Sequence, residues 1–143
     1  MNTLQYSKYQ KCMNILIIDD DTFLRETMCE LLKQRKHIVS TAANGSEGLD
    51  ILKMNTFDLV ITDILMPEKD GIEIINEIKM FYPKTKILAM SAGGRISSVD
   101  YLNVAKHFGA EGIIAKPFSA NSLFEKITEI SQAPNLKSGE KTV

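Results

Sequence analysis

Five short apolar segments alternate with five longer amphipathic segments along the chain. Most of the short segments are apolar at nearly every position, which is typical of strands buried on both faces of a sheet. The longer segments repeat apolar residues at helical spacing. The short segments are Asn14–Ile18, His37–Thr41, Leu59–Thr62, Lys86–Met90 and Gly112–Ala115, and the longer ones are Thr22–Arg35, Ser46–Met54, Gly71–Phe81, Val99–Phe108 and Ala120–Ser131. Strict alternation predicts an α/β fold, a doubly wound (βα)5 unit with a five-stranded parallel sheet and right-handed crossovers.

The alternating pattern occupies one part of the chain, residues 13–131. A chain of 143 residues has the length of one domain. Residues 1–12 are polar without an apolar period, and we expect a flexible N-terminal arm there. Residues 132–143 are polar and contain Pro134 and Gly139, a composition that predicts a disordered C-terminal tail.

Composition and charge exclude several classes of protein. The 17 basic and 18 acidic residues give a net charge of −1, so a nucleic-acid partner is not expected. The chain contains no apolar run near the ~18 residues of a membrane helix, so we expect no membrane partner and a cytoplasmic location. Cys12 and Cys29 lack metal-type spacing and are expected to be reduced thiols. His37 and His107 have no ligand partners at suitable spacing and are expected at the surface or at a strand edge.

Carboxylates follow two of the predicted strands. Asp19 and Asp20 come directly after one apolar run, and Asp63 comes after another. The carboxyl ends of parallel strands form one edge of a sheet, where ligands bind in such folds. Clustered carboxylates raise one another's pKa, and a hard cation such as Mg²⁺ relieves their repulsion. The pattern predicts metal-assisted phosphate chemistry with Asp63 as a possible nucleophile, while Asp21 is better explained as a helix cap.

Two further polar residues are predicted at the same edge. Ser91 ends the run that starts at Lys86, and Lys116 follows the last apolar run. A lysine at the end of a buried strand is costly unless it pairs with an anion. Lys116 could form a salt bridge with the carboxylates or hold a phosphoryl oxygen, and Ser91 could bond to its own loop or to the same ligand.

These motifs together resemble the receiver domain of two-component response regulators, in its stand-alone chemotaxis form. The resemblance spans about residues 13–131 and implies a flavodoxin-like sheet of strand order 2-1-3-4-5. The matching motifs are Ile17-Ile18-Asp19-Asp20, Asp63-Ile64-Leu65-Met66-Pro67-Glu68-Lys69-Asp70-Gly71, Ser91-Ala92 and Lys116-Pro117-Phe118.

The resemblance implies a role for each acidic residue. Asp63 would accept a phosphoryl group from a phosphohistidine of a sensor histidine kinase or a histidine phosphotransfer protein. Mg²⁺ would be the cofactor, held by Asp20, by Asp63 and by the backbone carbonyl of Leu65, with Asp19 acting through water.

Lys116 and Ser91 receive roles in the same way. Lys116 would pair with Asp63 and then with the phosphoryl group. Its peptide bond to Pro117 would be cis. Ser91 would bind a phosphoryl oxygen and report phosphorylation to a downstream protein target, or the chain would relay the phosphoryl group onward. The surface for that target would be formed by parts of Val99–Phe108, Gly112–Ala115 and Ala120–Ser131.

The sequence departs from the family pattern near the last strand. Ile113 occupies the position of an aromatic switch residue and is a possible switch position. Gly93 and Gly94 follow Ser91-Ala92 and are expected to make that loop mobile. The side chains of Leu65 and Gly93 cannot orient a hydrolytic water by hydrogen bonding, which predicts slow self-dephosphorylation.

Three other functions remain open on the residues alone. A Mg²⁺-dependent phosphatase with an Asp nucleophile usually carries a second carboxylate two residues later, where this chain has Leu65. A flavin- or nucleotide-binding domain would need a phosphate-cradling loop after the first strand, where Asp19 and Asp20 would repel phosphate. A receiver that serves only as a scaffold would not need the complete acidic set.

Overall fold

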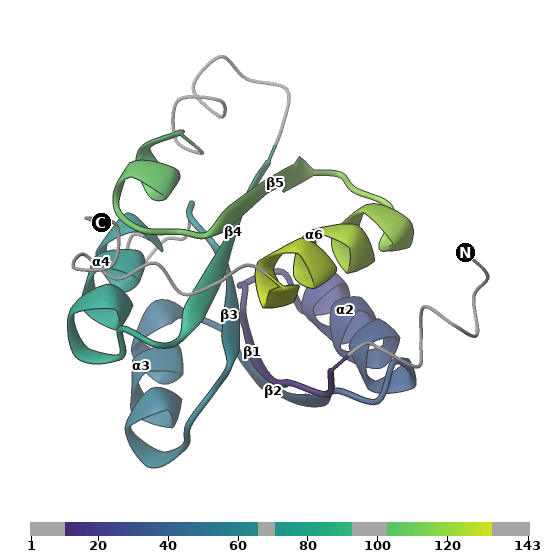
Figure 1. Ribbon diagram of the computed structural model, residues 1–143, viewed down its shortest axis with the longest axis horizontal. Coiled ribbons are helices and arrows are strands. Elements are labelled where there is room, and N and C mark those ends of the chain that lie inside the picture. Colours follow the sequence, from purple (N-terminus) through teal and green to yellow (C-terminus); the bar gives the residue numbers. More distant parts are fainter. Residues whose placement is uncertain (1–10, 66–70, 93–102, 133–143) are drawn as a thin grey trace.

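The five predicted strands form one parallel sheet in the computed structural model, which describes residues 11–65, 71–92 and 103–132 (Figure 1). The order across the sheet is β2-β1-β3-β4-β5, and every neighbouring pair is parallel. This confirms the predicted α/β class and the flavodoxin-like order. The strands are β1 (Asn14–Ile18), β2 (Ile38–Ala42), β3 (Leu59–Asp63), β4 (Lys86–Ala92) and β5 (Gly112–Lys116).

Helices cover both faces of the sheet, as Figure 1 shows. α2 and α6 lie on one face, and α3 and α4 lie on the other. Residues 103–107 are also helical, and the start of the predicted segment Val99–Phe108 lies outside the described residues. The helices with complete bounds are α2 (Thr22–Gln34), α3 (Gly45–Met54), α4 (Gly71–Phe81) and α6 (Ala120–Gln132).

Alternation of side chains along each strand divides the core into two layers. Successive strand residues point to opposite faces. In β1, for example, Ile15 and Ile17 pack with the helices α2 and α6, whereas Leu16 and Ile18 pack with α3 and α4. All four side chains are fully buried, which explains why the strand is apolar at every one of these positions.

Four strands extend one or two residues beyond their predicted ends. β2 continues to Ala42, β3 includes Asp63, β4 continues to Ala92, and β5 includes Lys116. Registers that pair Asp63 with Met90 and Ala92 with Lys116 sustain these extensions. Asp63, Ser91 and Lys116 therefore belong to the ends of strands, whereas Asp19 and Asp20 directly follow β1.

His37 is buried just before the edge strand β2, with 5% of its surface exposed, so the expectation of a surface position was wrong. Its Nδ1 accepts a hydrogen bond of 3.1 Å from the N–H of Met13. Burial lowers the pKa of His37, and the positive charge of Arg35 lowers it further. Sequence spacing alone could not reveal this partner, which lies 24 residues away.

Side chains cap the starts of two helices, one of them the cap expected at Asp21. Asp21 caps α2 by accepting a hydrogen bond of 3.1 Å from the N–H of Leu24. Asn44 caps α3 by accepting one of 2.9 Å from the N–H of Glu47. Each cap satisfies one of the free N–H groups at a helix start.

Other expectations concern the cysteines, the membrane and the termini. Cys12 and Cys29 are both free thiols, as predicted. Within the described ranges, no helix has both the length and the apolar character needed to cross a bilayer. The predicted N-terminal arm and C-terminal tail lie almost entirely outside the described residues.

Candidate functional site

Three carboxylates meet at the carboxyl edge of the sheet. β1 and β3 are neighbours, with Ile18 opposite Thr62, so the next residues, Asp19 and Asp63, lie side by side. One carboxylate oxygen each from Asp19, Asp20 and Asp63 lies within 4.8 Å of the others. Asp19 is fully buried and Asp63 is 5% exposed, whereas Asp20 faces solvent. The predicted cluster therefore exists, with two buried members and one exposed member.

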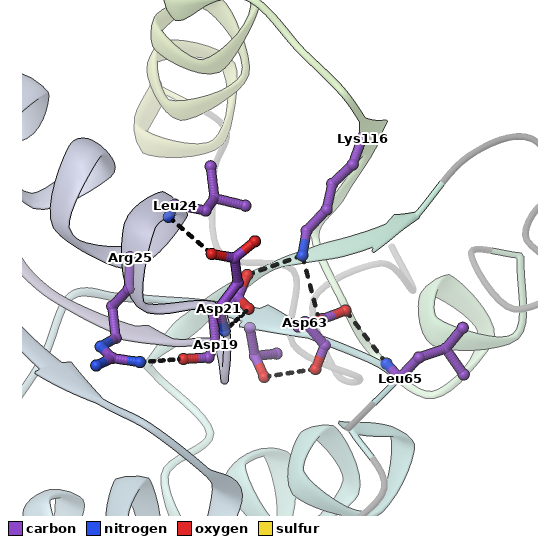
Figure 2. A network of polar contacts seen from close by, with 8 residues as sticks. Asp19, Asp21, Leu24, Arg25, Asp63, Leu65 and Lys116 are labelled. Atoms are coloured by element: carbon purple, nitrogen blue, oxygen red, sulfur yellow. Dashed lines mark hydrogen bonds and ion pairs between the residues drawn. The ribbon is translucent and has the colours of Figure 1, made fainter. Parts of the chain in front are cut away.

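Lys116 joins this cluster from the end of β5, the edge strand two strands away from β3. Its Nζ lies 2.8 Å from Oδ2 of Asp19 and 3.2 Å from Oδ2 of Asp63. Figure 2 draws both contacts as dashed lines. The bond between Lys116 and Pro117 is cis, as the resemblance implied. The resemblance implied pairing with Asp63, and the structure adds a shorter contact with Asp19. The ammonium group of Lys116 thus bridges the two buried carboxylates.

Side-chain alternation explains why these groups converge. Asp19, Asp63 and Lys116 follow Ile17, Ile61 and Ile114 by two residues, and those three isoleucines all belong to the core layer under α2 and α6. Residues two apart in a strand point to the same face. The three ionisable side chains therefore point to that same side, where each strand leaves the apolar core.

Burial and charge shift the ionisation of this group. Burial raises the pKa of Asp63; Lys116 opposes the rise and Asp19 adds to it. Burial alone would lower the pKa of Lys116, but its hydrogen bond to Asp19 and its attraction to both carboxylates outweigh burial and raise that pKa. The lysine therefore stays charged, and burial makes the ionised form of Asp63 depend on a nearby cation.

Backbone and side-chain donors hold Asp19 in place. The N–H of Asp21 donates to its Oδ1 over 2.9 Å, and Nη1 of Arg25 donates to its carbonyl oxygen over 2.7 Å (Figure 2). Sequence reasoning missed Arg25. The available signal was its position, one turn into α2 and six residues after Asp19.

Asp63 is held by its own neighbours. The N–H of Leu65 donates to its Oδ1 over 3.2 Å, and the Oγ1 of buried Thr62 donates to its carbonyl oxygen over 3.0 Å. A Cβ added at Gly71 would lie 2.5 Å from that carbonyl oxygen and 2.3 Å from Cα of Ile64. Thr62 and Gly71 were not singled out as site residues because their partners are backbone atoms. Metal binding by the Leu65 carbonyl stays a prediction.

Ser91 lies near the end of β4, the strand between β3 and β5. Its hydroxyl is fully buried and has no hydrogen-bond partner in the described part of the chain. Leaving a buried hydroxyl unsatisfied costs about 1–3 kcal/mol. The structure does not join Ser91 to the carboxylates by any direct bond, so its predicted role depends on a ligand.

Ile113 and the glycine loop stand apart from the acidic cluster. Ile113 is partly buried and packs against the core layer under α3 and α4. The residues Gly93 and Gly94 lie outside the described ranges, as do residues 66–70. Their predicted contributions stay predictions.

The donor set suits a hard divalent cation. Three carboxylates supply oxygen ligands, which Mg²⁺ prefers, and exposed Asp20 leaves an aqueous side for the waters that Mg²⁺ retains. The three carboxylates present therefore fit a bound Mg²⁺ ion.

Comparison with known proteins gives a consistent result. The family model described as the response regulator receiver domain matches residues 15–128. The chemotaxis protein CheY of Halobacterium salinarum is 34% identical over 119 residues, which cover 83% of this chain and 97% of that protein. CheY of Bacillus subtilis is 38% identical over 117 residues, which cover 80% of this chain and 94% of the relative.

Solved structures agree with the sequence relatives. The chemotaxis protein CheY4 of Vibrio cholerae superposes with a TM-score of 0.76 at 27% identity and covers 84% of this chain and 99% of its own. Fold, acidic cluster and sequence similarity thus converge, and the chain belongs to the family of response regulator receiver domains.

Proposed function

We propose that Asp63 accepts a phosphoryl group from a phosphohistidine, with Mg²⁺ held by Asp20, by Asp63 and by the backbone carbonyl of Leu65, and by Asp19 through water. The donor would be a sensor histidine kinase or a histidine phosphotransfer protein. One observation carries the proposal. The buried carboxylate of Asp63 is held within ion-pairing distance of Lys116 and beside two other carboxylates that could share a cation.

The transfer is a displacement at phosphorus. A carboxylate oxygen of Asp63 forms the new bond, the phosphorus–nitrogen bond breaks, and the imidazole leaves with the electron pair. Such transfers depend mainly on positioning and charge neutralisation. Mg²⁺, when bound, supplies the divalent charge that offsets the phosphoryl oxygens.

Residues of the chain perform the rest of the reaction. Lys116 already lies 3.2 Å from Asp63 and would shift one of its N–H donors to a phosphoryl oxygen. The hydroxyl of Ser91 would donate to another phosphoryl oxygen and so gain the partner it lacks. The hydrogen bonds from Thr62 and Leu65 keep the Asp63 backbone and carboxylate oriented for attack.

Phosphorylation would act as a switch read by another protein. A new hydrogen bond at Ser91, near the end of β4, would bias the packing of Ile113 on the adjacent strand β5. The two positions are close because Ile113 lies opposite Ala89, two residues before Ser91 in β4. A ligand shifts a conformational equilibrium only by its differential affinity for the two states. We infer that a downstream protein binds the surface formed by residues 103–107, β5 and α6, or that the chain passes its phosphoryl group to a histidine of a protein bound there. Either event would take place in the cytoplasm.

A phosphatase with an Asp nucleophile is disfavoured at this site. Such an enzyme would use a carboxylic acid two residues after the nucleophile to protonate the leaving group. Leu65 stands there and exposes 44% of its surface to solvent. An alkyl side chain cannot transfer a proton.

Acetyl phosphate or phosphoramidate with Mg²⁺ provides the test. We expect the mass of the chain to rise by one phosphoryl group, and Asp63→Asn to remove that gain. Asp50→Asn is a matched control, because Asp50 is an exposed carboxylate on α3, and it should be phosphorylated like the wild type. Wild-type chain that gains no mass, or an Asp63→Asn chain that gains as much, would refute the proposal.

A further inference from the structure

The outer edge of β2 presents unpaired backbone groups. β2 lies at one end of the sheet and has β1 as its neighbour. In a parallel strand, alternate residues direct both N–H and C=O to the same neighbour. The N–H of Ile38 donates to Met13 over 3.0 Å, and the carbonyl of Ala42 accepts from Asp19 over 3.2 Å. The backbone groups of Val39 and Thr41 therefore point away from the sheet.

Both ends of this open edge are closed by local bonds. Before it, the N–H of His37 donates to the carbonyl of Leu32 over 3.1 Å. After it, the N–H of Ala43 donates to Oε1 of Glu47. Within the described residues no strand pairs with the segment between these points. The open edge is therefore short, with Val39 and Thr41 as its donors and acceptors.

β2 lacks the features that usually protect an edge strand. Natural edges carry charged side chains, proline or bulges that prevent pairing with another chain. β2 has the sequence Ile-Val-Ser-Thr-Ala, without a charge or a proline, and Ile38 at its start is 63% exposed. The opposite edge strand, β5, is followed directly by Pro117.

Opposite charges flank the two ends of the edge. Lys36 precedes β2, is exposed, and forms no ion pair with any residue in the described ranges. Its φ of 73° lies in the left-handed region, where glycine is the favoured residue at a helix end. Glu47 is exposed beside the end of β2. An antiparallel copy of this edge would bring each Lys36 near the Glu47 of the other copy.

We propose that β2 pairs with β2 of a second copy of this chain, antiparallel and about a two-fold axis at Ser40. Val39 of each copy would exchange N–H and C=O hydrogen bonds with Thr41 of the other. Ser40 would face Ser40 across the axis as a non-hydrogen-bonded pair, with Cα atoms about 4.5 Å apart. A two-fold contact requires a self-complementary patch, and the alternation of donors, acceptors and end charges provides one.

The contact leaves the acidic cluster free and predicts weak association. Asp19, Asp63 and Lys116 point to the side of α2 and α6 and do not contribute to the outer edge of β2. Pairing over five residues buries an area at the low end of protein interfaces, so the association depends on concentration. The proposal does not rest on phosphorylation of Asp63.

Charge substitutions at the axis provide the test. In Ser40→Glu and in Ser40→Lys, like charges would oppose each other across the pair and prevent self-association. Sedimentation velocity of the full chain up to about 1 mM should show association of the wild type, monomers for each variant alone, and association again when the two variants are mixed. Wild-type chain that stays monomeric, variants that associate as the wild type does, or a mixture that stays monomeric would overturn the proposal.

A second variant guards against a loss of folding in the first pair. Thr41→Pro removes an N–H that points away from the sheet, a position where proline is tolerated in edge strands. It should retain the wild-type circular dichroism spectrum and remain monomeric. In the wild type, the amides of Val39 and Thr41 should exchange hydrogen rapidly when dilute and more slowly when concentrated. Protection in dilute solution would show that another segment covers the edge and would also overturn the proposal.

Discussion

Replacement of Gly71 by alanine should slow phosphorylation of Asp63 and should also weaken the fold. The new Cβ would lie 2.3 Å from Cα of Ile64 and 2.5 Å from the carbonyl oxygen of Asp63, closer than the 3.0 Å that real Cβ atoms respect. Both obstacles are backbone atoms, so the start of α4 or the Asp63 peptide must move. The overpacking should cost about 1–3 kcal/mol of stability.

The displaced peptide is the one that carries the proposed acceptor. Relief of both contacts requires a shift on the order of 1 Å, and a misplacement of that size can slow a reaction about 100-fold. We therefore expect the rate of phosphorylation by acetyl phosphate, followed by mass, to fall by about two orders of magnitude. Urea unfolding of the same sample would report the stability cost separately.

Gly48 provides a matched control within the same protein. A Cβ at Gly48 would lie 2.5 Å from Cδ1 of Ile18, the flexible end of a side chain, and not against backbone. Gly48→Ala should lower the free energy of unfolding by a similar or smaller amount and leave the phosphorylation rate near that of the wild type. Equal rates for Gly71→Ala and Gly48→Ala would refute the reasoning that close packing at Gly71 positions Asp63.

Two further predictions concern pH and metal. The folded pKa of His37 lies below its unfolded value of 6.5, so its contribution to stability is present above pH 6.5 and is lost as pH falls from there through the folded pKa, by up to about 1.4 kcal/mol per pH unit. His37→Asn keeps an acceptor for the Met13 amide. Between pH 7 and pH 5 the unfolding free energy of this variant should fall by less than that of the wild type. An equal fall in both proteins would contradict the role given to His37. Asp20 is exposed, so Asp20→Asn should leave the melting temperature in a chelator unchanged. The variant should lose most of the stabilisation that saturating Mg²⁺ confers on the wild type, which is about 2.7 kcal/mol at 100 times Kd. Stabilisation of the variant by Mg²⁺ to the wild-type extent would argue against Asp20 as a ligand.

Much of the fold could be predicted because each strand signals itself locally. An apolar run such as that in β1 implies burial on both faces, and alternation with amphipathic helices implies a parallel sheet. The same logic predicted that Asp19 and Asp63 would meet, since both follow strands of one polarity. In the observed register Ile18 lies opposite Thr62, which places the next residues, Asp19 and Asp63, side by side as expected.

Contacts that depend on backbone atoms or on distant segments could not be predicted. Arg25 binds the carbonyl of Asp19 and Thr62 binds that of Asp63. Because every residue has a backbone carbonyl, no particular residue type marks the partner in the sequence. Lys116 approaches Asp19 more closely than Asp63, although Asp63 belongs to the strand nearer to β5. The buried hydrogen bond of His37 likewise joins it to Met13, which lies 24 residues away in the sequence.

The most direct test of the central claim is to locate the phosphoryl group in the chain. An acyl phosphate on an aspartate is reduced by borohydride to homoserine, which peptide mass spectrometry can place at a single position. After treatment with acetyl phosphate and Mg²⁺, we predict homoserine at position 63 and unmodified aspartate at positions 19 and 20. Homoserine at either of those two positions, or at none of the three, would contradict the account.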